Sequence, residues 1–167
     1  MDFKTIYATK AEAYEAMIVP EDYQGNLLPA LEQIRPFTNT NVVEFGAGTG
    51  RLTCMLAPLV AHIHAGDGSA HMLSVAEQKL RAGGWHNWQL HHADNAHLPL
   101  PDHSADIAIE GWSFAHACGW FPDTWRHEVG QMIAEMQRIL KPGGTFILLE
   151  TLGTGFEQPT PPTDYLA

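Results

Sequence analysis

The sequence predicts an α/β protein built around a mostly parallel sheet of about five strands, with helices on both faces. Three observations predict this fold. Short apolar segments alternate with helical segments or long connections along the whole chain. A glycine-rich turn follows the first of these apolar segments. Acidic residues close the second and third segments, at the strand ends where such sheets bind ligands.

The composition predicts a single globular domain. The chain has 167 residues, of which 45% are hydrophobic, which is enough to build a core and argues against disorder. We expect a helical cap over residues 1–40, the sheet with its helices over 41–152, and a loop-like tail over 153–167.

The N-terminal region predicts two helical stretches. The segment TKAEAYEAMIV is rich in helix formers, and Pro20 is expected to end it. The following stretch carries Gly25 and Pro29, which predict a break or kink. Its apolar residues recur at helical spacing and are expected to be buried together: Leu27, Leu28, Leu31 and Ile34.

The remaining elements follow from apolar pattern and turn residues. Strands are expected at 41–45, 61–67, 88–94, 105–112 and 145–152, and helices at 51–60, 69–84 and 124–140. The proline-rich segment 98–104 is expected to be a loop, and KPGG at 141–144 a turn. The second helix has Ser69 as its cap, Gly83 at its end and the apolar face Met72, Leu73, Ala76 and Leu80. The third has the apolar face Val129, Ile133, Met136 and Leu140.

The glycine-rich turn has the sequence EFGAGTG at positions 44–50. A dinucleotide site requires GxGxxG, whereas here the third glycine comes one position early and Arg51 stands where that pattern needs glycine. Glu44, inside the strand, would repel a pyrophosphate but suits a ligand that carries positive charge. The alternative is an ordinary joint between a strand and a helix.

Two further acids follow the next two strands. Asp67 can accept hydrogen bonds from both hydroxyls of a ribose, or can serve only as an acid at a helix N-terminus. Asp94 can accept from an adenine amino group, or can simply form a turn with Asn95.

Taken together, these motifs resemble the class I methyltransferases that depend on S-adenosyl-L-methionine (SAM), of the small-molecule type with a Rossmann-like fold. Four segments match in order: VVEFGAGTGRLT, GDGSAHMLSVAEQKL, HADNAHLPLPDHSADIAIE and EMQRILKPGGTFILLE. They cover roughly residues 41–150, and the glycine turn followed by LKPGG makes the pattern specific.

The resemblance implies SAM as the cofactor and assigns positions around it. Glu44, Gly46, Ala47, Gly48 and Gly50 would surround its methionine and ribose portions. Asp67 would bind the ribose hydroxyls beside Gly68, with Met72 against the adenine. Asp94 would bind the adenine amino group, and Asn95, where alanine is common, would supply a backbone contact. Arg138 to Gly144 would be structural.

Methyl transfer needs alignment rather than an enzyme nucleophile, and the sequence has no nucleophile motif such as GxSxG. An acceptor hydroxyl would need a base, and the candidates lie in the segment from Glu110 to His116. His116 is the candidate base, with packing or surface exposure as the alternative. The candidates for an acceptor wall or cover, with core packing as the alternative, are Tyr7, Tyr14, Trp112 and Trp120.

Several other functions are excluded by composition. With a net charge of −10, the chain lacks the basic surface that nucleic-acid binding requires. The ten histidines lack a tight ligand spacing, and Cys54 and Cys118 have no metal or redox spacing, so we expect no metal. No apolar run reaches the roughly 20 residues of a membrane span, and the N-terminus does not look like a secretory signal, so a cytoplasmic protein is expected.

The C-terminus departs from the family. Its sheet usually continues with a helix and an antiparallel strand pair, whereas GTGFEQPTPPTDYLA is loop-like. We therefore expect the C-terminal β-hairpin region to be absent and Phe146 to Leu149 to lie on an exposed sheet edge. An exposed edge of this kind is expected either in a shortened domain or in a homodimer whose second copy covers the edge.

Two other functions are open at this point. A shortened or degenerate domain would bind SAM, or a partner, without turnover. A nicotinamide-dependent oxidoreductase is opposed by the early glycine, by Arg51 and by the lack of a Tyr-x-x-x-Lys pair.

Overall fold

The computed structural model describes residues 9–150. All five strands of its sheet are parallel, in the order β3-β2-β1-β4-β5. In chain order the strands are β1 (Asn41–Phe45), β2 (His62–Asp67), β3 (Trp88–His92), β4 (Ala105–Gly111) and β5 (Leu140–Leu149). The strand order reverses between β1 and β4, which is where parallel sheets of this kind form their ligand sites. The predicted fold class is confirmed.

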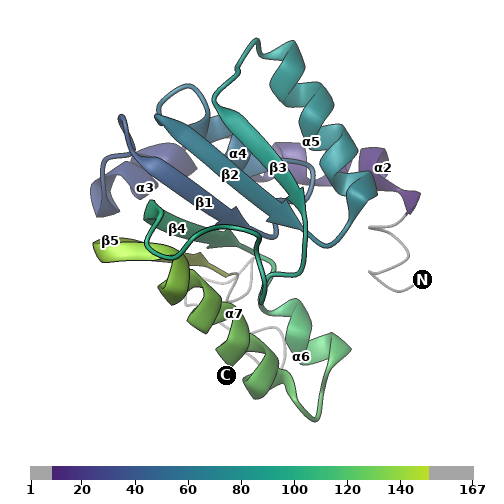
Figure 1. The fold of residues 1–167 in the computed structure, drawn as a ribbon. Helices are drawn as coiled ribbons and strands as arrows, with labels where there is room; N and C mark the ends of the chain where they lie inside the picture. The colour runs from purple at the N-terminus through teal and green to yellow at the C-terminus, as the bar shows by residue number, and fades with distance from the viewer. Residues whose placement is uncertain (1–8, 151–167) are drawn as a thin grey trace.

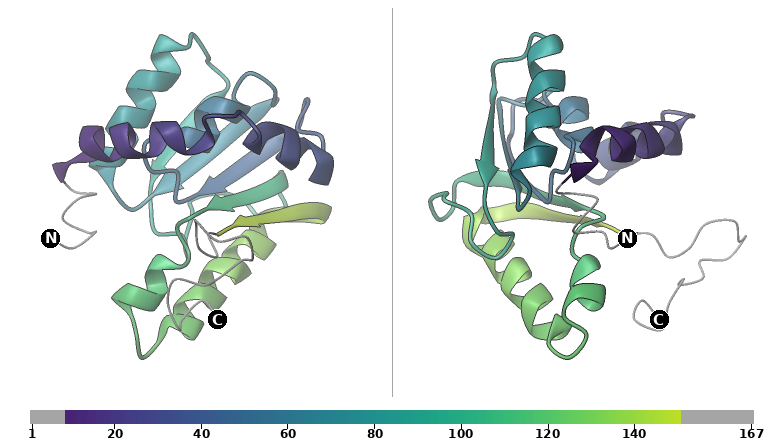
Figure 2. Two further views of the ribbon diagram at one scale, coloured as in Figure 1. Left: turned by 180° about the vertical axis from the view of Figure 1, so that it is seen from behind. Right: turned by 90° about the vertical axis from the view of Figure 1, so that its right-hand side faces the viewer.

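Helices cover both faces of this sheet, as Figures 1 and 2 show. They are α2 (Ala11–Ile18), the 3-10 helix η1 (Val19–Asp22), α3 (Leu27–Ile34), α4 (Arg51–Leu56), α5 (Ala70–Ala82), α6 (His116–Trp120) and α7 (Trp125–Ile139). Alternate residues of the strands point to opposite faces, so Val42 packs with α3, α4 and α5 while its neighbour Val43 packs with α7.

The core therefore has two apolar layers. One joins strand residues such as Ile63 and Ile107 to Leu56 of α4 and Leu80 of α5. The other joins Phe45 and Ala108 to Met136 and Ile139 of α7. A third, smaller cluster packs Ala11 and Tyr14 of α2 on Met72 and Val75 of α5, which brings the N-terminal segment to the carboxyl edge of the sheet.

The apolar faces expected from the sequence are partly confirmed. All four predicted residues of the α5 face are buried, and the Ser69 hydroxyl accepts from the Met72 N–H as the expected cap. Two residues expected to be buried are instead exposed, Ile34 by 59% and Ile133 by 39%. Ile34 ends the short helix α3, whereas Ile133 lies in the middle of α7, so the sheet does not cover the whole apolar stripe of either helix.

Several element boundaries differ from the expectation. α4 ends at Leu56 rather than residue 60, because Pro58 has no N–H to continue the helix. Pro29 lies in the first turn of α3, where a proline is tolerated, so no kink occurs there. The KPGG segment belongs to β5 as an irregularity beside Ala105, rather than forming a separate turn. The short helix α6 was not expected from the sequence.

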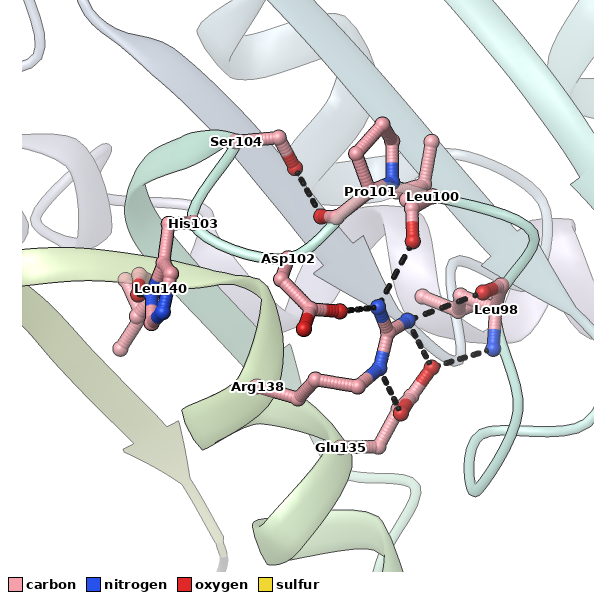
Figure 3. Close-up of polar contacts among 9 residues, drawn as sticks. All are labelled: Leu98, Leu100, Pro101, Asp102, His103, Ser104, Glu135, Arg138 and Leu140. Atoms are coloured by element: carbon pink, nitrogen blue, oxygen red, sulfur yellow. Dashed lines mark hydrogen bonds and ion pairs between the residues drawn. The ribbon is translucent and has the colours of Figure 1, made fainter.

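The long connection between β3 and β4 contains no helix and is held by the side chain of Arg138 (Figure 3). Its guanidinium donates to the backbone oxygens of Leu98 (3.2 Å) and Leu100 (2.8 Å) and to the Asp102 carboxylate (2.6 Å). It also pairs with Glu135 one turn earlier on α7 at 2.7 Å, and Glu135 accepts the Leu98 N–H at 2.7 Å. These contacts fasten the loop to α7.

Replacing Arg138 with alanine is expected to lower the free energy of unfolding by about 2–4 kcal/mol, because the substitution leaves the buried Glu135 carboxylate without its cation. Chemical denaturation measures the loss. The control is Arg81→Ala, which removes an ion pair with Glu77 that lies on the exposed surface of α5. This substitution should lower the free energy of unfolding by about 0.5 kcal/mol or less. Equal losses in the two variants would contradict the role of Arg138.

Candidate cofactor and acceptor site

The glycine turn after β1 packs directly against the turn after β4. Gly46 has a φ of +69°, and a Cβ there would lie 2.3 Å from the Cβ of Ser113. Neither a left-handed backbone nor a contact of that length accommodates a side chain. Gly50 is restricted in the same way, because it has a φ of +79° and a Cβ there would lie 2.8 Å from Ala76 of α5. Gly46 therefore brings β1 and β4 together, and Gly50 brings α4 and α5 together.

Glu44 is a buried carboxyl beneath this turn. It is 2% exposed and accepts a hydrogen bond from the Thr53 hydroxyl of α4 at 2.5 Å. Burial raises the pKa of Glu44 to about 8, against the weaker effects of the Thr53 hydrogen bond and the Lys79 cation. The side chain therefore carries its proton near neutral pH unless a positive charge is placed beside it.

Asp67, the last residue of β2, connects the second strand to the glycine turn. One carboxylate oxygen accepts the Gly48 N–H at 2.8 Å and the other accepts the Ser69 N–H at 2.7 Å. Burial raises the pKa of Asp67, although these two hydrogen bonds oppose the rise. Asp67 thus fixes the conformation of the turn and keeps acceptor capacity on both oxygens.

The other positions expected around an adenine lie farther along the same edge. Asp94 is exposed, and its carboxylate accepts the Ala96 N–H at 2.8 Å. This hydrogen bond forms the turn that the sequence offered as the alternative to an adenine contact. Asn95 lies near Ser113, and its buried Oδ1 has no hydrogen-bond partner among the described residues. Gly68 is exposed, whereas Met72 is only 1% exposed and packs beneath α2.

The turn after β4 is held by the buried carboxyl group of Glu110. Glu110 is fully buried, and its Oε1 accepts the N–H groups of Ser113 and Phe114 and the Ser113 hydroxyl. Burial raises the pKa of Glu110 to about 7, with Glu150 adding to the rise. Trp112 has a φ of +60°, which is rare for a bulky residue and marks a constrained backbone.

His116 begins α6 directly after this turn. Its Nδ1 lies 3.0 Å from the Ser113 carbonyl oxygen, and its ring stacks on Trp120 with centroids 5.2 Å apart. Because a carbonyl oxygen only accepts, Nδ1 carries the hydrogen and the neutral ring presents its basic lone pair at Nε2.

These turns enclose a cavity of about 240 Å³. The α2–η1 segment forms its opposite wall, where Glu21 pairs with Arg51 at 2.6 Å and the Arg51 guanidinium stacks on Trp112 at 4.7 Å. Nearby, Glu15 of α2 pairs with Lys79, which also donates to the Thr49 carbonyl oxygen. The cavity is thus closed by residues from the N-terminal cap, the glycine turn and the turn after β4.

The structure brings together seven of the residues predicted from the sequence. The cavity is lined by Glu44, Gly46, Ala47, Gly48, Tyr14, Trp112 and His116. The other predicted residues do not line it: Gly50, Asp67, Gly68, Met72, Asp94, Asn95 and Glu110. Tyr7 lies outside the described residues.

The sequence interpretation did not find seven further lining residues, which are Met17, Ile18, Glu21, Thr49, Arg51, Leu52 and Gly111. Thr49 and Arg51 belong to the glycine motif and were within reach of that pattern. Met17, Ile18 and Glu21 carry no motif, because only the packing of α2 on α5 places them there.

Within residues 9–150, no group of three or more His, Cys, Asp or Glu side chains could hold a metal ion, and no helix is long and apolar enough to span a membrane. The imidazoles of His64 and His91 do meet, with Nδ1 and Nε2 3.0 Å apart.

This fold, with a glycine turn over a buried acid and a second acid closing the next strand, defines the class I SAM-dependent methyltransferases. The chain belongs to the methyltransferase domain family, whose sequence model matches residues 43–148.

Curated relatives with similar sequences are also methyltransferases. A demethylmenaquinone methyltransferase of Listeria welshimeri is 31% identical over 124 residues, which cover 72% of this chain and 49% of that protein. One from Geobacillus stearothermophilus is 36% identical over 107 residues, 62% of this chain and 42% of that protein. This chain thus spans about half the length of the curated relatives it matches.

Solved structures are also similar. The DhpI–SAM–HEP complex superposes with a TM-score of 0.68 at 26% identity, covering 90% of this chain and 65% of that one. YcgJ from Bacillus subtilis gives 0.66 at 25% identity, covering 78% and 52%.

Replacing Gly46 with alanine should destabilise the fold by about 2–4 kcal/mol, because the new methyl group needs both a strained backbone and the space that Ser113 occupies. Gly84→Ala is the matched control, since Gly84 has a φ of +73° but no neighbour within 4 Å of a Cβ, and should cost about 1 kcal/mol. Thermal or urea unfolding measures both. A loss at Gly46 no larger than that at Gly84 would refute the close contact.

The raised pKa of Glu44 predicts a pH-dependent stability. The folded protein holds this proton up to about pH 8, whereas the unfolded chain releases it near pH 4.5. Folding is therefore favoured below that lower pH, and this contribution is lost as pH rises to about 8. Relative to Glu44→Gln, the wild type should lose on the order of 2–4 kcal/mol between pH 5 and pH 8. Parallel unfolding curves at both pH values would show that Glu44 titrates normally.

Proposed function

We propose that this chain binds SAM at the carboxyl edge of β1, β2 and β4 and transfers its methyl group to a small-molecule acceptor. The observation that carries the proposal is the buried, uncompensated Glu44 carboxyl beneath a left-handed glycine turn that lines a cavity. An acid kept from water without a cation of its own suits a ligand that brings positive charge.

The residues present fit this cofactor. The Thr49 hydroxyl is buried at the cavity wall and has no hydrogen-bond partner among the described residues, so a polar ligand group would satisfy it. A Cβ on Gly48, with φ +54°, would meet nothing within 4 Å, which leaves room for a ligand against the backbone. Glu44 and the glycine turn would hold the methionine end, and Asp67 the ribose hydroxyls. Gly68, Asp94 and Asn95 would lie along the adenine.

When bound, SAM supplies a methyl group that is already activated by its sulfonium. The protein then has to align the acceptor and exclude water, which is worth about 7–11 kcal/mol in favourable cases. For a hydroxyl acceptor, Nε2 of His116 would take up the hydroxyl proton as the oxygen receives the methyl group.

The cavity wall supports a small acceptor with an apolar or aromatic body. Tyr14 and Trp112 supply aromatic surface, and Met17, Ile18 and Leu52 supply aliphatic surface. A cavity of about 240 Å³ and a chain with a net charge of −10 give no support to a nucleic-acid acceptor. Location in the cytoplasm and pairing of two copies through the edge of β5 remain predictions.

Calorimetry with SAM tests the proposal, and Asp67→Asn is the informative variant. We expect the dissociation constant to rise at least about tenfold, since an amide cannot accept from two ribose hydroxyls and still accept both backbone N–H groups. Asp102→Asn is the control, because Asp102 is an acid remote from the cavity and should leave affinity unchanged.

A product assay on the same samples then separates the enzyme from a binding module. Formation of S-adenosylhomocysteine with members of a small-molecule acceptor panel supports transfer. Tight SAM binding with no product across the panel favours a module without turnover. Equal affinities of the wild type and Asp67→Asn would refute the assignment of the ribose site.

A further inference from the structure

In the turn that follows β4, the Trp112 N–H donates to the Leu149 carbonyl oxygen of β5, and the N–H groups after it donate to carboxyl groups. Three consecutive backbone N–H groups donate to acids: Ser113 and Phe114 to Glu110, and Ala115 to Glu150 at 2.9 Å. Glu110 ends β4 and Glu150 follows β5, so the two acids reach the same turn from neighbouring strands. No basic side chain takes part in these bonds.

Using Glu110 to cap this turn costs the free energy of removing its carboxyl group from water. It is fully buried, and its Oε2 has no hydrogen-bond partner among the described residues. Burial raises the pKa of Glu110, and the nearby Glu150 raises it further. A neutral side chain would satisfy the same N–H groups without this cost. Buried groups that break such local rules concentrate at functional sites.

The consequence of this turn is the position of His116. The backbone N–H of Ser113 donates to Glu110. The carbonyl oxygen of Ser113 accepts both the backbone N–H of His116 at 3.2 Å and its Nδ1 hydrogen at 3.0 Å. The Ser113 side chain is fixed as well, because it touches the Gly46 turn and donates to Glu110 at 3.1 Å. Any movement of Ser113 would therefore turn the imidazole that lines the cavity.

We propose that Glu110 is a positioning residue that acts through Ser113 to fix the Nδ1–H tautomer of His116, so that the basic lone pair of this cavity-lining ring lies on Nε2. The inference deepens the proposed function, on which its catalytic meaning rests. The charged groups that face His116 are Asp67 from β2 and Glu150 from the end of β5.

Nitrogen NMR of the histidine side chains in the free protein tests this without any methyl acceptor. The His116 signals are identified by their loss in His116→Gln. In Glu110→Ala we expect the ratio of the Nδ1–H to the Nε2–H tautomer of His116 to fall about tenfold, which corresponds to about 1.4 kcal/mol. Glu110→Gln should restore most of it, because the amide oxygen still accepts from Ser113 and Phe114.

The matched control is Glu135→Ala, which removes another buried carboxyl that accepts a backbone N–H, that of Leu98. It should leave the tautomer of His116 unchanged, and the paired signals of His64 and His91 should be constant in all variants. An unchanged ratio in Glu110→Ala, or an equal change in Glu135→Ala, would overturn the proposal.

A second measurement uses the unaltered protein, in case Glu110→Ala does not fold. The amide shifts of Ser113 and Phe114 should titrate with the Glu110 carboxyl carbon at a shared midpoint near pH 7, while the Leu98 amide does not move there. Flat Ser113 and Phe114 shifts through that titration would overturn the proposal. SAM calorimetry on the unaltered protein is independent, so absence of SAM binding there together with the expected tautomer result would refute the proposed function alone.

Discussion

The contact between Gly46 and Ser113 is the constraint on which the site depends. It closes the gap between the ends of β1 and β4, the point where the strand order reverses. A residue with a side chain at position 46 would hold the two turns apart, and with them Glu44 on one side and His116 on the other. Asp67 adds the third strand to this arrangement, because its carboxylate holds the Gly48 N–H. Two backbone turns and one side chain therefore set the geometry of the cavity wall at the sheet edge.

Local features of the sequence were sufficient for the elements that form this wall. Strand β1, the glycine turn and the Ser69 cap of α5 are each determined by residues close in the chain, and each was predictable. The strand ends that carry Asp67 and Asp94 followed from the same patterns. What these patterns could not decide was the second function of each acid, since an Asx turn and a ligand contact use the same residue type.

Long-range packing decided the parts that the sequence did not reveal. Ile34 and Ile133 have the spacing of buried residues but are exposed, because the partner surface and not the period determines which positions are covered. The wall residues Met17 and Glu21 enter the site only because α2 packs on α5 through Ala11 and Met72. No local pattern encodes that contact.

The buried carboxyl groups show that the fold treats structural and cavity acids differently. Glu135 is buried beside Arg138, whose guanidinium lowers the pKa of that carboxyl and lets it stay ionised while it holds the loop before β4. Glu44 and Glu110 are buried just as deeply, have no arginine partner and have raised pKa values. The same chain thus supplies an arginine to the acid that fastens the loop before β4 and none to the two acids near the carboxyl ends of β1 and β4, although Glu21 at the cavity wall does pair with Arg51. Stability is given up at those two positions, which is common for buried acids at functional sites.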